Sequence, residues 1–329
     1  MAAFRGNGRD GGRSGWFARA AGSFAIVFVG LLASVAPAHA DAPTVVVSIK
    51  PIHSLVTSLM QGVGEPLLLV DGTASPHSWT LKPSQAAALS EAGLVVWIGA
   101  GMESYLASPI GSLVPDERVL ELSELPAVEL LPLRESGVWE PHAHEEDDSR
   151  ADHDHAGYDP HLWLDPQNAI VIARAVAERL VALDPAHADL YQSNLAALTA
   201  AIEGLDSEAA AAFAPVQNAP YIVFHDAFQY LERRYDLNGV GAILLDPEQG
   251  ASAARLSAIR DRLAEADVVC AFAEPQVDIG LLETAIEGTD VRIATLDPEG
   301  LAIEPGPALY GTLFEGLVRT MAECLSPPG

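Results

Sequence analysis

Residues 44–70 read TVVVSIKPIHSLVTSLMQGVGEPLLLV and contain a complete strand–helix–strand unit. The apolar run at 44–49 predicts a strand. Lys50-Pro51 ends this run, and a helix is expected from there to about Gln61. The run at 66–70 predicts a second strand. Strands that alternate with helices in this way favour a parallel sheet covered by helices on both faces.

The alternation continues along the chain and is interrupted once. Further strands are expected at residues 94–98, 118–122, 221–224, 240–245, 268–272 and 291–296, and further helices at 84–92, 252–266, 279–287 and 309–324. Between the two groups, Asp165-Pro166 begins a helix to about Leu183. A second helix of roughly 40 Å follows at 185–213, and Gly204 does not end it. The sequence therefore predicts one α/β lobe, a long helix and another α/β lobe.

The first forty residues have the features of an export signal. Arginines precede the apolar run FAIVFVGLLASV at 24–35, and Ala38-His39-Ala40 matches the small-x-small site of signal peptidase. We expect residues 1–40 to be a cleaved signal peptide. A retained N-terminal anchor is the alternative. The expected domains are then an N-terminal lobe at 41–184, a linking helix at 185–213 and a C-terminal lobe at 214–329.

Charge and cysteine content limit the possible partners and the compartment. The chain has 45 acidic and 18 basic residues, a net charge of −27. Residues 1–40 carry four arginines and one aspartate, so the mature chain would have a net charge of −30. This charge argues against nucleic acid, which requires a basic surface. In an exported protein the only two cysteines, Cys270 and Cys324, are expected to form one disulfide; two buried thiols are the alternative.

A histidine-rich acidic loop is expected at about 140–157, where the strand and helix pattern breaks. Its tract HAHEEDDSRADHDH carries four histidines among carboxylates: His142, His144, His153 and His155. His-x-His pairs among carboxylates can bind a borderline metal ion such as zinc. The alternative is a solvated acidic loop without a role. We expect weak, variable metal binding here, because such a loop offers no rigid support for its ligands.

Three other histidines and one aspartate occupy positions typical of a binding site. His77 follows the expected strand at 66–70, and His225 directly follows the strand at 221–224. His161 lies just before a helix, and Asp297 follows the strand at 291–296. Ligands of open α/β sheets bind beyond the carboxyl ends of the strands. Three imidazoles and one carboxylate suit tetrahedral zinc, although a capping or core role is the alternative for each histidine and an Asx-Pro turn for Asp297.

Several segments resemble the zinc-uptake solute-binding proteins of bacterial ABC transporters, the ZnuA type. They are GTASPHSWTLKPS at 72–84, DPHLWL at 159–164 and VFHDAFQY at 223–230, with FAEPQ at 272–276 and TLDP at 295–298 as further matches. The resemblance covers the whole mature chain in order, and a histidine-rich loop is typical of the family.

The resemblance implies a fold and a site. Two pseudo-symmetric α/β lobes with mainly parallel sheets would be joined by one long helix, with zinc in the cleft between them on His77, His161 and His225. Some relatives carry a glutamate immediately before the first histidine, but Pro76 stands there in this chain. A water or Asp297 would therefore complete the shell. The family's disulfide also agrees with the pair Cys270 and Cys324.

The implied function is a monomeric periplasmic receptor that binds Zn²⁺ and delivers it to a membrane ABC permease. A manganese-type or surface metal-binding receptor is one alternative, but manganese-binding relatives carry a glutamate where this chain has His225, and an imidazole favours zinc. A zinc hydrolase is another alternative. The sequence lacks His-Glu-x-x-His, but Glu274 or Asp226 could serve as a general base. We expect a binding protein and not an enzyme.

Overall fold

A computed structural model describes residues 42–70, 79–134, 138, 157–245, 252–275 and 279–327 of the 329-residue chain. The predicted signal peptide, His77 and the histidine-rich tract lie outside these residues. Seventeen helices and strands are described: β1 (Val45–Val47), α1 (Lys50–Leu59), β2 (Leu67–Leu68), α2 (Pro83–Glu91), β3 (Leu94–Trp97), α3 (Ser104–Leu113), β4 (Val119–Glu121), α4 (Pro166–Leu183), α5 (Ala188–Phe213), β5 (Tyr221–His225), α6 (Gln229–Tyr235), β6 (Gly239–Leu244), α7 (Ala253–Glu265), β7 (Cys270–Ala273), α8 (Gly280–Ile286), β8 (Arg292–Thr295) and α9 (Leu309–Leu325).

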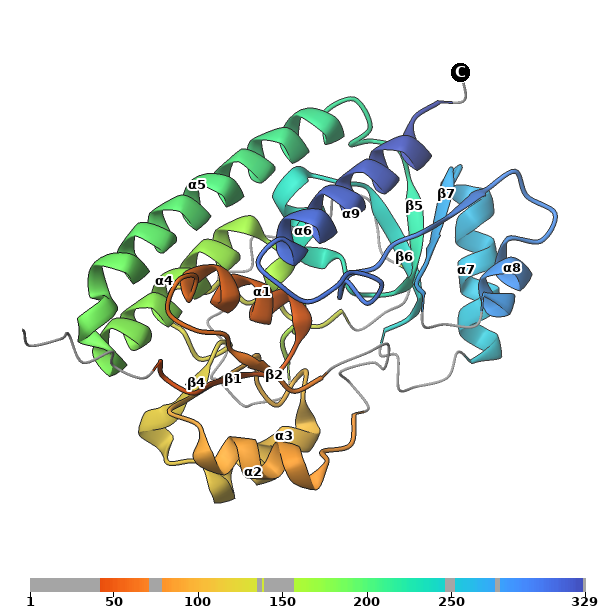
Figure 1. Ribbon diagram of the computed structural model, residues 1–329. Coiled ribbons are helices and arrows are strands. Elements are labelled where there is room, and N and C mark those ends of the chain that lie inside the picture. The colour runs from red at the N-terminus through yellow and green to blue at the C-terminus, as the bar shows by residue number, and fades with distance from the viewer. Residues whose placement is uncertain are drawn as a thin grey trace, which may run out of the picture. The chain divides into compact units, whose positions relative to one another are not determined.

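The first sheet has the strand order β2-β1-β3-β4, and all its pairs are parallel. Successive side chains along each strand point to opposite faces of the sheet. Val46 and Val95 belong to an apolar cluster with residues of α2 and α3, whereas Val45 and Val47 belong to the cluster that includes α1. Helices therefore cover both faces of this sheet (Figure 1), as the sequence predicts.

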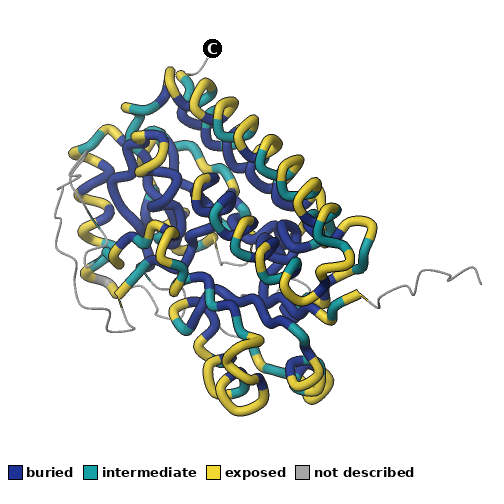
Figure 2. The backbone as a smooth tube through the Cα atoms, turned by 90° about the vertical axis from the view of Figure 1, so that its left-hand side faces the viewer, coloured by how far each residue is buried: buried dark blue, intermediate teal, exposed yellow. Residues whose placement is uncertain are grey.

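The second sheet repeats the first. Its strand order is β6-β5-β7-β8, again entirely parallel, so both sheets place their first strand beside their second and third strands. Ile222 and Phe224 face α7 and α8, and Val223 faces the opposite side. The predicted pair of α/β lobes with pseudo-symmetric parallel sheets is confirmed. Strands β1, β3, β5, β6 and β7 consist of buried residues only, whereas β2 and β8 include exposed residues. Figure 2 shows buried stretches of backbone in the interior and many exposed residues along the outer helical coils.

A long helix follows the first lobe, as the sequence predicts. A 3₁₀ turn at Pro185–His187 leads into α5, which runs for 26 residues with Gly204 inside it. This helix packs against α4 and α9 (Figure 1). One apolar core includes residues from both lobes, among them Leu55 of α1 and Phe314 of α9. The described residues from 42 to 327 pack as one unit, and the predicted lobe boundaries at 184 and 214 stay a prediction.

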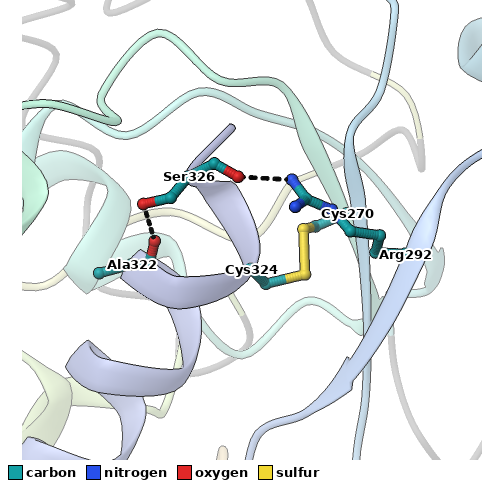
Figure 3. Close-up of a disulfide and its surroundings, with 5 residues drawn as sticks. All are labelled: Cys270, Arg292, Ala322, Cys324 and Ser326. Carbon is teal, nitrogen blue, oxygen red and sulfur yellow. Dashed lines mark hydrogen bonds between the residues drawn. A yellow bond between two sulfur atoms is a disulfide. The ribbon is translucent and has the colours of Figure 1, made fainter. Parts of the chain in front are cut away.

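The two cysteines form the predicted disulfide. Cys270 begins β7, and Cys324 lies in the last turn of α9, with 6.1 Å between their Cα atoms. Close by, Arg292 of β8 donates a hydrogen bond of 2.8 Å to the carbonyl oxygen of Ser326 (Figure 3). The last helix is therefore attached to the second sheet by a covalent bond and a hydrogen bond. None of the described helices combines the length and the apolar character needed to cross a membrane.

Candidate metal centre

His225 is the last residue of β5, an inner strand of the second sheet. All five residues of this strand are buried, and the side chain of His225 is about 5% exposed. Its Nδ1 lies 3.1 Å from Oε1 of Glu274, which follows the neighbouring strand β7. The carboxyl ends of two adjacent parallel strands thus bring a carboxylate to the imidazole.

His161 is held by the aspartate two residues before it. Oδ1 of Asp159 accepts hydrogen bonds from the backbone N–H of His161, at 3.0 Å, and from its Nδ1, at 2.7 Å. The backbone of Asp159 is itself fixed from two directions. Its N–H donates to the carbonyl of Leu131 at 2.7 Å, and its carbonyl accepts from the hydroxyl of Tyr230 at 2.8 Å. Tyr230 belongs to α6 of the C-terminal lobe, so both lobes position this histidine.

The two imidazoles meet between the lobes. Their ring centroids are 4.9 Å apart, and the rings are inclined by 66°. Each Nδ1 is hydrogen-bonded to a carboxylate, which favours the tautomer with the proton on Nδ1 and the lone pair on Nε2. Zinc-binding histidines almost always have such a partner on the ring nitrogen that does not bind the metal. The pair therefore has the arrangement of two metal ligands.

Burial and charge set the protonation of this pair. Burial lowers the pKa of His161 well below 6.5, and the neighbouring charge of His225 lowers it further. Burial also lowers the pKa of His225, but Glu274 beside it overcomes this effect, and the net shift is upward. Burial raises the pKa of Asp159 to about 6, although the N–H of His161 counteracts the shift. His161 is therefore neutral, whereas His225 keeps its proton to a higher pH than an isolated imidazole does.

The other predicted ligands are not grouped with this pair. His77, His142, His144, His153 and His155 lie outside the described residues. Asp297 follows β8 as predicted, but its carboxylate accepts from the backbone N–H groups of Glu299 and Ala302, each at 3.3 Å. In the ranges that the structure describes, no three or more His, Cys, Asp or Glu side chains form a group that could hold a metal ion. The complete ligand set stays a prediction.

The sequence pattern does not predict a metal-site role for the two carboxylates that contact the histidines. In the sequence, Asp159 lies in the resemblance segment DPHLWL, and Glu274 lies in the resemblance segment FAEPQ and is a possible general base. Glu274 could have been found by the same rule that found His225, because both lie at the carboxyl ends of strands. Asp159 has a weaker signal, an acidic side chain two residues before a histidine.

An ion-pair network flanks His225. Arg134 donates to Asp226 at 2.8 Å and to Glu232 at 2.5 Å, and Glu232 also accepts from the hydroxyl of Tyr221 at 3.1 Å. Arg134 comes from the segment between the first sheet and the histidine-rich tract. It therefore ties this segment to the residue that follows His225.

Comparison with known proteins identifies the family. The model of the family described as "Zinc-uptake complex component A periplasmic" matches residues 45–324. The chain belongs to this family. The high-affinity zinc uptake system protein ZnuA of Brucella suis is 40% identical over 305 residues, which cover 86% of this chain and 91% of that relative.

Solved structures agree with the family assignment. A crystal structure of ZnuA is 27% identical, has a TM-score of 0.71, and covers 87% of this chain and 100% of its own. A ZnuA deletion mutant with zinc bound is 25% identical, has a TM-score of 0.70, and covers 88% and 100% of the two chains. Members of the family are periplasmic components of zinc uptake, which fits the fold and the paired histidines of this chain.

Proposed function

We propose that this protein is the zinc-binding receptor of a zinc-uptake ABC transporter. It is exported to the periplasm by a cleaved signal peptide, binds Zn²⁺ between its lobes, and delivers the ion to a membrane permease. His77, His161 and His225 supply three imidazole ligands, and Asp297 or a water completes the shell. Family membership and the zinc uptake named for the Brucella relative support this proposal.

One observation carries the proposal. His161 and His225 come from different lobes and are both buried, with 4.9 Å between their ring centroids. The Nδ1 of each ring contacts a carboxylate oxygen. Burying two imidazoles and two carboxylates together is costly unless a cation compensates the negative charge. A divalent ion that binds Nε2 of both rings supplies this compensation. Imidazole ligands favour zinc over manganese.

A zinc hydrolase is supported less well. Both residues that could serve as a general base have other partners. Glu274 accepts from Nδ1 of His225, and Asp226 accepts from Arg134. A base must be able to take a proton from a metal-bound water, and these carboxylates are instead occupied in orienting and charge-pairing other side chains.

The histidine-rich tract at 142–155 supplies additional, weaker zinc binding in this proposal. It raises the local zinc concentration near the tight site, and the net charge of −30 expected for the mature chain attracts cations to the surface. Deleting residues 139–156 removes the extra zinc and leaves one tight ion per chain. Loss of the tight site on deletion would place a tract histidine among its ligands.

Titration of the metal-free protein with zinc, with ions counted per chain, tests the proposal. Replacing His161 or His225 by Ala should weaken the tight site at least tenfold, about 1.4 kcal/mol. His187→Ala is the matched control, because the side chain of His187 is 33% exposed and its ring pairs with Asp184 next to α5. Tight binding that survives the loss of each buried histidine would refute the proposed site.

A further inference from the structure

The amine of Lys50 is an unusual contact between the lobes. Lys50 is the first residue of α1 and is 7% exposed. Its Nζ contacts three carbonyl oxygens of one C-terminal segment: Leu301 at 2.8 Å, Ile303 at 3.2 Å and Gly300 at 3.5 Å. The three N–H donors of an ammonium thus meet three backbone acceptors about 250 residues away in the sequence.

The helix dipole and the loss of hydration both make this position unfavourable for a cation. The N-terminus of a helix carries a partial positive charge, so a lysine there is repelled by the helix dipole. A buried ammonium also loses its hydration, a cost that only good hydrogen bonds offset. A specific interaction with the segment 297–303 explains why a lysine is stable at this place.

The segment 297–303 also touches the surroundings of the histidine pair. It begins with Asp297, and the carbonyl of Pro298 accepts a hydrogen bond of 2.9 Å from Nε1 of Trp163. The ring of Trp163 lies against His161, with 5.4 Å between the centroids. The segment held by Lys50 therefore contacts the side chain that packs on one proposed ligand, and it carries another.

The shape of the segment leaves little freedom for it to move independently. Gly300 has φ +69°, and a Cβ there would lie 3.1 Å from a side-chain atom of Leu313 and 3.2 Å from one of Leu309. The segment is thus packed on α9 on one side and fixed to Lys50 on another. We expect loss of the amine contacts to shift the whole segment, including Asp297 and Pro298.

We infer that Lys50 is a positioning residue of the zinc site. Its amine holds the segment 297–303 in the place that zinc binding requires. This inference rests on the proposed function. It also has a reciprocal consequence. If the lysine contact strengthens zinc binding by a given factor, zinc strengthens the lysine contact by the same factor.

The reciprocal effect can be measured in the unaltered protein. Lys50 and Lys82 are the only lysines of the chain, so acylation of each amine can be followed by mass spectrometry without ambiguity. We expect saturating zinc to slow acylation of Lys50 about tenfold. Lys82 is more exposed but lies close in sequence to the proposed ligand His77, so the rate of Lys50 is compared with its own rate in the absence of zinc. A Lys50 rate that is the same with and without zinc would overturn the inference.

Variants of Lys50 measure how the lysine contact affects zinc affinity. Lys50→Met keeps the apolar stem but removes the charge and the three donors, and we expect about tenfold weaker zinc binding. Lys50→Arg keeps the charge and should restore part of the loss. Arg292→Met is the matched control, because Arg292 also donates to a backbone carbonyl but within the C-terminal lobe; its zinc affinity should equal that of the unaltered protein.

A double-mutant cycle with Asp297→Asn separates positioning from a general loss of stability. If Lys50 acts through its segment, Lys50→Met should weaken zinc binding less in a chain that already carries Asp297→Asn than in the unaltered chain. Fully additive effects would overturn the inference. An unaltered protein that binds no zinc would refute the proposed function and this inference together, whereas equal affinity of Lys50→Met and the unaltered protein would refute the inference alone.

Discussion

Replacing Asp159 by Asn tests whether a carboxylate behind His161 contributes to metal binding. Oδ1 of Asp159 accepts from both the backbone N–H and Nδ1 of His161, whereas the buried Oδ2 has no hydrogen-bond partner within the described ranges. Asn keeps the shape and one acceptor oxygen but removes the charge. A partner of this kind behind a zinc-binding histidine accounts for about 10–100-fold in affinity, so we expect zinc binding to weaken by about 1.4–2.8 kcal/mol.

In the metal-free protein, Asp159→Asn should be favourable, because it should raise the free energy of unfolding. Burial raises the pKa of Asp159 from 3.8 to about 6. The folded protein therefore favours the protonated carboxyl. The stability of the folded state is highest below pH 3.8 and falls as the pH rises through 6, and at pH 7.5 the ionised carboxylate destabilises the folded state by about 3 kcal/mol. Asn removes this cost, although its amide N–H₂ must find an acceptor. We therefore expect the metal-free variant to be at least as stable as the unaltered protein.

Competition with a zinc chelator at pH 7.5 measures the affinity, and thermal unfolding in the presence of EDTA measures the stability of the metal-free form. Asp165→Asn is the matched control for zinc affinity. Asp165 lies four residues from His161 and caps α4 by accepting from the N–H of Gln167 at 2.8 Å, a role that Asn performs equally well. An Asp159→Asn variant with unchanged affinity, or one that loses affinity and metal-free stability together, would show that the carboxylate has only a structural role.

Three further predictions follow from individual groups. Zinc affinity should fall as the pH drops through the raised pKa of His225, because zinc must displace its proton; chelator competition that is flat from pH 7.5 to 5 would contradict this. Burial raises the pKa of Glu103 from 4.5 to about 7, so its stability contribution is lost as the pH rises through 7. Denaturant unfolding should show Glu103→Gln stabilising the protein by about 3 kcal/mol at pH 8 and not at pH 4. Replacing Cys270 and Cys324 together by Ala should lower the free energy of unfolding by about 4 kcal/mol, as expected for a separation of 54 residues; equal stability of the two proteins would be the contrary result.

The strands could be predicted because each is a short apolar run that ends at a polar or turn-forming residue. All eight predicted strands are present, and the β-α-β alternation gave both parallel sheets. The sequence pattern does not predict two of the described helices. α3 contains Pro109 and Gly111, which weaken the helical signal, and α6 has only seven residues. Their formation depends on packing against the sheets, which local sequence does not encode.

The site was predictable only in part, for a similar reason. The position of His225 at a strand end follows from the apolar run before it. His161 precedes a 3₁₀ turn, Leu162–Leu164, and not a strand end, so its approach to His225 depends on how the lobes pack. The pairing of Glu274 with His225 joins residues 49 positions apart. Such a contact is decided by the strand order, which the sequence pattern leaves open.

The shared core suggests how far the lobes can move when zinc enters or leaves. Leu55 and Trp163 of the N-terminal lobe belong to the same buried cluster as Phe272 and Phe314 of the C-terminal lobe. A wide hinge opening would expose several of these side chains, and each would cost about 1.5–3 kcal/mol. Motions of short segments are far less costly. We therefore expect zinc entry and release to depend on local shifts at the carboxyl ends of the sheets, where 297–303 contacts Lys50, and not on separation of the lobes.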